Sequence, residues 1–177
     1  MINSNYVIYS AGVLPYCLTN NGNLMFLLGK DYENKWSDFG GRCEAGDKSD
    51  PTITAAREFW EETLGCIFDL SYVTKLTKKI EFVESKTQMG YPYYMYLIKI
   101  PYKEEYKNYF KSTRSFISKI NIDRKYKEKL DIRWFSLESI DNHKGFFTIK
   151  TCFNNTFNQN KEKILDIINN RTKIPST

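Results

Sequence analysis

The chain has 177 residues, of which 41% are hydrophobic and 16% aromatic, and this is enough for one ordinary globular domain. No run approaches the roughly 18 apolar residues of a membrane helix, and residues 1–18 lack the basic start and small-residue cleavage pattern of a signal peptide. The formal net charge of +5 is compatible with a polyanionic partner, although a lysine-rich solvated surface explains it as well. We expect a cytoplasmic protein that contacts no membrane and needs no obligate protein partner.

The four cysteines are scattered along the chain and none stands in a Cys-x-x-Cys pair; they are Cys17, Cys43, Cys66 and Cys152. This spacing favours neither a zinc ribbon nor a small disulfide scaffold, and it fits a reducing compartment.

Two β-rich runs open the chain, at residues 6–18 and 23–29, and the Asn21-Gly22 step between them is a strong signal for a tight turn. We therefore predict a hairpin. A long polar, glycine-bearing loop follows and ends at Asp50-Pro51. Asp50 can cap a helix whose first residue is Pro51, and Gly65 can end it in the left-handed conformation. The pattern thus predicts a helix over residues 51–64.

The second half of the chain has strand-like runs at residues 73–85 and 93–100, followed by a lysine-rich helical insertion near residues 102–128. A further strand is predicted over residues 131–137, and an amphipathic helix over residues 160–171 closes the chain. We find no internal repeat and no linker, and we expect residues 1–177 to form one domain of the α/β class.

The predicted helix at residues 51–64 carries three glutamates, Glu58, Glu61 and Glu62, on one face. Its opposite face is apolar, with Ile53, Ala56, Phe59, Trp60 and Leu64. Like charges at this spacing repel one another, and no lysine stands four residues on to relieve them. A hard divalent cation would neutralise them, because Mg²⁺ takes carboxylate oxygens together with substrate phosphate oxygens. The alternative is a solvated acidic face.

The residues before this helix decide between the two readings. Two adjacent glycines, Gly40 and Gly41, are followed by Arg42 and then by an acidic residue in the loop. Taken in order, the relevant residues are Gly41, Asp47, Arg57, Glu58, Glu61, Glu62 and Gly65. This series resembles the signature of the Nudix hydrolases, G-x5-E-x7-R-E-U-x-E-E-x-G-U.

The series departs from that signature in three places. Asp47 stands where the first glutamate is usual, nine residues instead of seven separate it from Arg57, and two residues instead of one precede Gly65. The first two changes concern the loop, where a shorter carboxylate still reaches Arg57 across the extra slack. The third lies at the helix end, away from the carboxylates. None of the three removes a candidate metal ligand.

The resemblance implies an α/β/α sandwich around a mixed β-sheet and Mg²⁺- or Mn²⁺-dependent hydrolysis of the diphosphate bond in a nucleoside diphosphate linked to another group. It implies Glu58 and Glu62 as the first metal ligands, Glu61 as a third ligand or a base, and a backbone carbonyl of Gly41 as a further donor. The metal would neutralise the charge that develops in the transition state and activate the attacking water.

The remaining motif residues are implied to hold the site together. Arg57, which belongs to the catalytic signature, is expected to pair with Asp47 or a glutamate and so to fix the acidic helix to its loop. Gly40, Gly41 and Gly65 supply the bends on either side. A separate general base often comes from a later loop in this family; the candidates are Glu81, Glu84, Glu104, Glu105 and Asp131, each of which is more simply a surface charge. His143, in the polar stretch "DNHKG", is most simply a loop residue.

The substrate is less well defined by the sequence. Arg42 is a candidate phosphate contact or a solvated loop cation, and Trp36 and Tyr94 are candidates to stack a base, although aromatic residues in strands are more often core. The other aromatic candidates near Tyr94 are Tyr91, Tyr93 and Tyr96. A phosphoanhydride-containing nucleotide ranks first. Capped RNA, from which a decapping enzyme would release m7GDP, ranks close behind because of the basic insertion. A Nudix-fold binding module without turnover is the third hypothesis.

Overall fold

The computed structural model describes residues 8–142 and 147–172. Two of the sequence predictions fall partly or wholly outside this range, namely the first two residues of the predicted strand at 6–18 and the loop position of His143. In the described part of the chain no helix is both long and apolar enough to cross a membrane.

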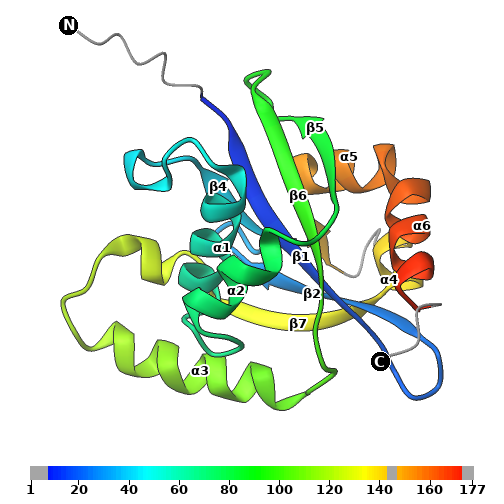
Figure 1. The fold of residues 1–177 in the computed structure, drawn as a ribbon. Coiled ribbons are helices and arrows are strands. Elements are labelled where there is room, and N and C mark those ends of the chain that lie inside the picture. The colour runs from blue at the N-terminus through cyan, green and yellow to red at the C-terminus, as the bar shows by residue number, and fades with distance from the viewer. Residues whose placement is uncertain (1–7, 143–146, 173–177) are drawn as a thin grey trace, which may run out of the picture.

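An eight-stranded mixed sheet forms the centre of the molecule (Figure 1), and its order is β5-β6-β1-β2-β3-β8, with β4 beside β1 and β7 beside β2. The strands are β1 (Ser10–Leu18), β2 (Leu24–Lys30), β3 (Lys35–Ser37), β4 (Phe39–Arg42), β5 (Phe82–Lys86), β6 (Pro92–Lys99), β7 (Asp131–Ser136) and β8 (Thr148–Ile149). The predicted hairpin is present, because β1 and β2 pair antiparallel with Tyr16 opposite Phe26.

Strand β1 has three partners along its length. It runs parallel to β6 throughout, while its first half pairs antiparallel with β4 and its end pairs with β2. In the pairing with β4, Gly12 lies opposite Gly40 and Ala11 opposite Gly41. The glycine pair that the sequence placed in a loop is therefore a short strand, and the sheet fixes its position.

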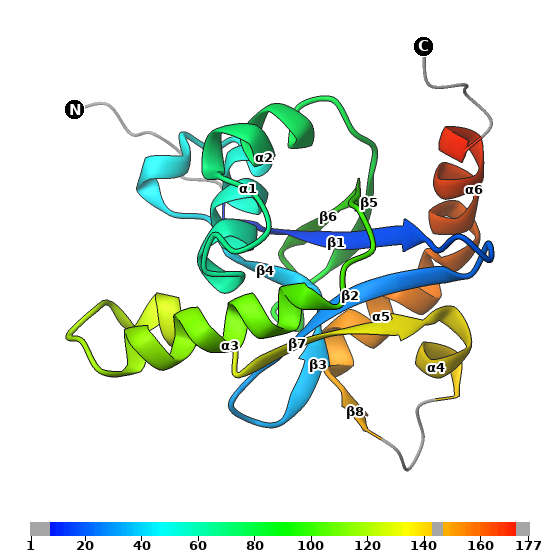
Figure 2. The ribbon, with the colours of Figure 1, turned by 90° about the horizontal axis from the view of Figure 1, so that it is seen from below.

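Helices cover both faces of the sheet, as Figure 2 shows. They are α1 (Pro51–Glu62), α2 (Leu70–Thr77), α3 (Glu105–Ser118), α4 (Leu137–Asp141), α5 (Thr151–Gln159) and α6 (Lys161–Thr172). Phe59 of α1 and Phe110 of α3 belong to the core on one face, and Phe153 of α5 and Ile164 of α6 belong to the core on the other. The predicted α/β/α arrangement around a mixed sheet is confirmed.

Helix α1 begins as predicted and ends slightly earlier. The Asp50 side chain accepts a hydrogen bond from the Thr52 N–H at 2.9 Å, and Pro51 occupies the first turn. The helix stops at Glu62, and both Leu64 (φ 57°) and Gly65 (φ 64°) are left-handed. At Gly65 a Cβ atom would also lie 2.9 Å from Trp60 Nε1. Glycine is therefore required there by both conformation and space.

The predicted strand at residues 73–85 is wrong over its first half. Residues 70–77 form α2, capped by the Asp69 side chain, which accepts from the Tyr72 N–H at 2.9 Å. Val73 and Thr77 lie four residues apart on its buried side, so the helical period governs this segment rather than the alternating one. Only the end of the predicted strand forms β5. The sequence analysis also missed α5.

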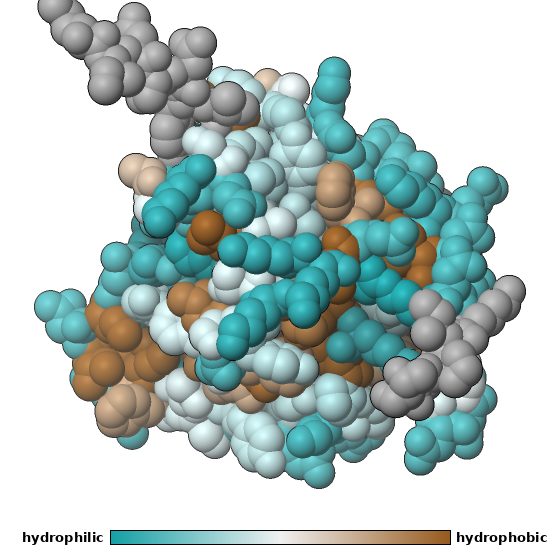
Figure 3. All heavy atoms as spheres, in the orientation of Figure 1, coloured by the Kyte–Doolittle hydropathy of each residue, from teal (hydrophilic) through white to brown (hydrophobic). Residues whose placement is uncertain are grey.

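The insertion consists of α3 and a short 3-10 turn, η2 (Arg124–Lys127), and it leads directly into β7. Immediately before β7, the Leu130 N–H donates to the Lys30 carbonyl of β2 at 2.6 Å. The surface of the insertion is not uniformly basic. Figure 3 shows an apolar patch over the C-terminal end of α3, where Phe116 and Ile120 are exposed.

Candidate active site

Arg57 of α1 is the centre of a charge network. Its guanidinium donates to both carboxylate oxygens of Asp47, at 3.0 and 2.9 Å, and to Glu58 and Glu61 at 2.8 and 3.1 Å. It also donates to the Arg42 carbonyl at 3.0 Å. Burial opposes ionisation of Arg57, but the hydrogen bonds to Asp47 and the charge of Glu58 outweigh it and raise its pKa. The predicted pairing of Arg57 with Asp47 is therefore present.

Asp47 is held from several sides although its side chain is shorter than the usual glutamate. It ends the 3-10 turn η1 (Ala45–Asp47), where the Glu44 N–H donates to its carboxylate at 2.8 Å, and the Thr54 hydroxyl donates at 2.8 Å. Burial acts to raise the pKa of Asp47, but the hydrogen bonds from Arg57, Glu44 and Thr54 leave it below its ordinary value. The ionised Asp47 thus ties the loop to α1.

The two adjacent glycines leave room for two of the carboxylates. A Cβ atom at Gly41 would lie 2.5 Å from the Glu58 carboxylate, so only glycine fits under that side chain. The Gly40 N–H donates to Glu62 Oε2 at 2.8 Å. Strand β4 and helix α1 are therefore joined through carboxylates as well as through their apolar side chains.

The expected alternative of a solvated acidic face is not what the structure contains. Glu58, Glu61 and Glu62 are 9%, 4% and 5% exposed. Burial raises the pKa of Glu58 to about 7, against the opposing charge of Arg57. Burial also raises the pKa of Glu62 to about 8, against the opposing charge of Lys129. These carboxylates are packed between α1, β4 and the insertion.

The insertion supplies cations that the sequence analysis did not connect with the glutamates. Lys125 Nζ lies 2.6 Å from Glu61 Oε1, and Lys129 Nζ lies 3.4 Å from Glu62 Oε1. Lys129 is itself buried and donates to Ser37 Oγ at 2.9 Å. Arg57 on the same helix and these two lysines together relieve the repulsion between the glutamates. The lysines lie more than sixty positions along the chain, so a search for a lysine four residues on would not find them.

A small cavity of about 260 Å³ opens beside this network, and we call it the carboxylate cavity. Its lining consists of Gly41, Arg42, Cys43, Glu44, Arg57, Glu58, Glu61, Lys125 and Glu128. Glu128 is exposed, and its charge contributes to raising the pKa of both Glu58 and Glu62. The sequence analysis missed this residue because "KYKEK" reads only as a charged surface run.

The five carboxylates that the sequence offered as a separate base lie elsewhere. None of them is part of the lining of the carboxylate cavity. Glu81 lies 3.7 Å from Arg171, Glu104 accepts from the Tyr102 hydroxyl, and Asp131 lies 3.8 Å from both Lys107 and Arg133. Glu84 and Glu105 are exposed. Among the acidic residues outside the motif and its loop, Glu128 is the one that the fold brings to the cavity.

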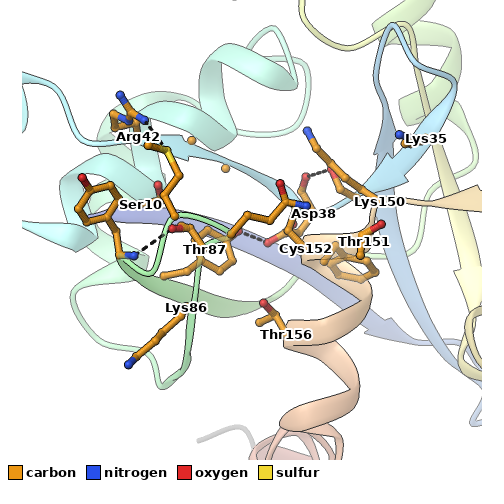
Figure 4. A pocket seen from close by; sticks show the side chains of 18 of the residues that line it. Ser10, Lys35, Asp38, Arg42, Lys86, Thr87, Lys150, Thr151, Cys152 and Thr156 are labelled. Carbon is orange, nitrogen blue, oxygen red and sulfur yellow. Dashed lines mark hydrogen bonds between the residues drawn. The ribbon is translucent and has the colours of Figure 1, made fainter. Parts of the chain in front are cut away.

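A larger pocket of about 620 Å³ lies on the other side of Gly41 and Arg42, and we call it the side pocket (Figure 4). Its lining combines segments from β1, the end of β3 through β4, the β5–β6 turn and the start of α5. Arg42, an expected substrate contact, lines both the side pocket and the carboxylate cavity. A group bound at Gly41 and Arg42 would thus face both spaces.

The other two expected substrate contacts do not line the side pocket. Trp36 is 4% exposed and packs edge-on against Phe135, so its ring faces are not open for stacking. Tyr94 points to the opposite face of the sheet, where it contacts Tyr9. Its neighbour Tyr93 lines the side pocket instead, because successive residues of a strand face opposite sides.

The carboxylate cavity has donors of the kind that hold Mg²⁺ or Mn²⁺. Glu58, Glu61 and Glu128 surround it together with Gly41, and oxygen ligands suit hard divalent cations. In the described residues no three acidic, histidine or cysteine side chains converge closely enough to hold an ion as they stand. The donor set fits such an ion in kind, and Lys125 must release Glu61 for that carboxylate to take part.

Comparisons with known proteins agree with this arrangement. A family model described as the NUDIX domain matches residues 9–153, and no curated protein sequence matches the chain. Solved structures with a similar fold include the following three. The Nudix hydrolase RenU of M. smegmatis has 11% identity and a TM-score of 0.53, with 90% of this chain and 87% of that chain covered. The NUDIX domain of Shewanella oneidensis NrtR, complexed with ADP ribose, has 13% identity and a TM-score of 0.54, with 90% of both chains covered. A C. elegans Ap4A hydrolase binary complex has 14% identity and a TM-score of 0.51, with 91% and 98% covered.

At these identities the solved structures show the likeness of the fold. The family model covers most of the chain, including β1, the glycine pair, α1 and β7. It agrees with the predicted enzyme class of a pyrophosphohydrolase. The signature around Gly41, Arg57 and the three glutamates, the α/β/α fold and the matched family model together show that the chain belongs to the Nudix hydrolase superfamily.

Proposed function

We propose that this protein hydrolyses the phosphoanhydride bond of a nucleoside diphosphate derivative with the help of Mg²⁺ or Mn²⁺. The observation that carries the proposal is the junction at Gly41 and Arg42, where the carboxylate cavity meets the side pocket. A diphosphate at this junction has acidic metal donors on one side and a space large enough for a nucleoside on the other.

The residues around the carboxylate cavity have separate roles in this reaction. Glu58, Glu61 and Glu128 would hold the metal with the Gly41 carbonyl, and Arg57 keeps the first two carboxylates in place. A bound divalent ion neutralises charge on the phosphates and lowers the pKa of the attacking water. Whichever of Glu61 and the exposed Glu128 does not bind the ion would take the proton of that water.

Glu62 remains a predicted ligand, but it starts from a different environment. Both of its oxygens already have partners, the Gly40 N–H and Lys129 Nζ, and it is not part of the cavity lining. We therefore assign Glu62 first to positioning strand β4. It would join the metal only if Lys129 moves away.

A second candidate function is removal of the cap from RNA. It is favoured by exposed cations beside both spaces, since Arg124 belongs to the 3-10 turn next to the carboxylate cavity and Lys86 lines the side pocket. An RNA chain that leaves the junction would meet these charges. Phosphate contacts of this kind make binding strongly dependent on salt.

A product assay tests both candidates. The protein is incubated with Mg²⁺ or Mn²⁺ and either a panel of nucleoside diphosphate derivatives or cap-labelled RNA, with Glu58→Gln as the control. We expect metal-dependent cleavage of a small substrate that the control loses. Release of m7GDP from RNA, with affinity that falls steeply as salt rises, would support decapping instead. Absence of any product while metal is bound would overturn both and favour a binding module.

A further inference from the structure

Asp38 is a buried carboxylate that the metal chemistry does not use. It directly precedes β4, lines the side pocket and is only 5% exposed. A charged group in such a position is costly unless it has partners, so its presence on a pocket wall requires an explanation. It is not part of the carboxylate cavity, and the Nudix signature does not include it.

Tyr93 fixes the orientation of this carboxylate. Its hydroxyl donates to Asp38 Oδ2. The Tyr93 hydroxyl fits there because Gly12 and Gly40 have no side chains. A Cβ atom added at Gly12 would lie 2.5 Å from the hydroxyl oxygen, and one added at Gly40 would lie 2.7 Å from it. Residues of β1, β4 and β6 thus hold the Asp38–Tyr93 pair in one geometry. The pair is built into the sheet and does not depend on a mobile loop.

Arg42 and Asp38 lie apart along the side pocket, as Figure 4 shows, and Asp38 lies near Cys152 and Lys150. Arg42 also lines the carboxylate cavity, so the phosphates belong at the Arg42 end, beside the candidate metal donors. The half-buried Tyr93 belongs to the same part of the lining as Asp38, whereas Phe153, which follows Cys152, is only 1% exposed. Aromatic surface beside a hydrogen-bond acceptor suits a nucleobase.

We propose that Asp38 selects a guanine-type base by accepting hydrogen bonds from its N1–H and 2-amino groups. A carboxylate accepts about four hydrogen bonds, of which the Tyr93 hydroxyl takes one. Guanine places two N–H donors side by side on one edge and so matches the two oxygens of a carboxylate. Adenine and cytosine place a ring acceptor next to the amino group, and uracil has a single N–H between two carbonyls.

This inference rests on the proposed function only in taking the ligand to be a nucleoside diphosphate. Charge-assisted, paired hydrogen bonds are strong, and a site built for donors rejects ligands that lack them because its own polar groups are left unpaired. The same edge is present in free guanine nucleotides and in the methylated guanine of an RNA cap. Both ligands therefore offer the same N–H donors to Asp38, and the experiment distinguishes a free guanine nucleotide from an RNA cap.

The test is calorimetric binding, which needs no turnover. GDP, IDP, ADP, UDP and m7GDP are titrated into the wild-type protein, into Asp38→Asn and into Tyr93→Phe. IDP is the matched ligand because it differs from GDP only by the missing 2-amino group. We expect wild-type protein to bind GDP about tenfold or more tightly than IDP, and more tightly still than ADP and UDP. Comparison of GDP with m7GDP tells a free nucleotide from a cap.

Asp38→Asn keeps the shape of the side chain but replaces one acceptor with a donor. We expect the ratio of GDP to IDP affinity to fall to about threefold or less in this variant, and to an intermediate value in Tyr93→Phe, while the affinity for pyrophosphate stays unchanged. Equal wild-type affinity for GDP and IDP overturns the inference even if Asp38→Asn does not fold. A preference for GDP that survives in a folded Asp38→Asn also overturns it. Cleavage without base preference would contradict this inference but support the proposed function. Selective binding of GDP without cleavage would support this inference but contradict the proposed function.

Discussion

The carboxylate cavity and the side pocket share Gly41 and Arg42 but are assembled from different parts of the chain. Most of the cavity lining comes from residues 41–61, which are the end of β4, the following loop and α1, and Arg57 connects its carboxylates. The side pocket combines segments from β1, β4, the β5–β6 turn and α5. The first is a local charge network, and the second is a surface that only the complete sheet brings together.

This difference separates two kinds of variant. Changes in the carboxylate cavity should affect stability, metal binding or turnover in the same way for every ligand. Changes in the side pocket, such as those at Asp38, should alter which ligand is preferred.

Loss of Arg57 should have the largest effect on stability. Arg57→Ala removes the cation that four carboxylates share and leaves Asp47, whose side chain is 2% exposed, without its ion pair. Breaking a buried pair from one side costs about 3–5 kcal/mol, and we expect this loss in the free energy of unfolding from denaturant titration. Lys161→Ala is the control, because it breaks a half-exposed pair with Asp141 and should cost less than about 1 kcal/mol. Equal losses in the two variants would show that the network is not a stabilising unit.

Replacement of Glu58 should abolish most of the activity while the protein stays folded. Glu58→Gln keeps the size of the side chain over Gly41 but removes the charge that faces the cavity. We expect kcat to fall by about 100-fold or more on every substrate that the wild type cleaves. Glu84→Gln, which changes an exposed carboxylate of β5, should retain wild-type kcat. A loss on one substrate alone would place Glu58 in ligand selection instead.

Removal of the Lys125 charge should change metal affinity more modestly. Lys125 lies 2.6 Å from Glu61 and competes with a divalent ion for that carboxylate. Lys125→Met should therefore tighten Mn²⁺ binding several-fold, measured by electron paramagnetic resonance of free Mn²⁺. Lys127→Met is the matched control, because Lys127 donates to the Ile120 carbonyl and does not line the cavity. Weaker Mn²⁺ binding in Lys125→Met would mean that the lysine supports the site rather than competing for it.

A change of pH should alter the stability of metal-free protein. Burial raises the pKa of Glu58 to about 7 and of Glu62 to about 8, from an ordinary value of 4.5. Between about pH 4.5 and 8 the folded state therefore holds protons that the unfolded state has released, so stability falls as the pH rises through this range. Shifts of this size in the two pKa values correspond to several kcal/mol, so we expect Tm to fall by about 10 °C or more between pH 5 and pH 8. Glu62→Gln should flatten this slope, and a Tm that rises over the range in wild-type protein would contradict the prediction.

The local half of the site could be predicted from sequence because its geometry is set by short spacings. The positions of Arg57 and Glu58 on one helix, and the link to Asp47, follow from a motif that spans about 25 residues. The partners of Glu61 and Glu62 could not be found in this way, since Lys125 and Lys129 approach them only after β7 has paired with β2.

Two other misses have similarly specific causes. The segment at residues 70–77 has apolar residues that satisfy both the helical and the alternating period over a short window, and the Asp69 cap decides for the helix. On β6, the sequence identified an aromatic strand but not which of its tyrosines face the side pocket. A shift of one residue, from Tyr94 to Tyr93, moves the predicted contact from one core to the other side of the sheet.

The hydrogen bond from Leu130 to Lys30 has a consequence for how this insertion tolerates changes of length. This bond anchors the chain to the sheet directly after Lys129. The sheet therefore fixes the positions of the charged residues that precede Leu130. Tyr126 adds a second anchor through its edge-on contact with Trp60. The Asp123 side chain caps η2, and the Ile120 carbonyl accepts from Lys127. Residues 121–122, which lie between them, are thus the segment in which related proteins or designed variants can gain or lose residues without displacing Glu128 from the cavity.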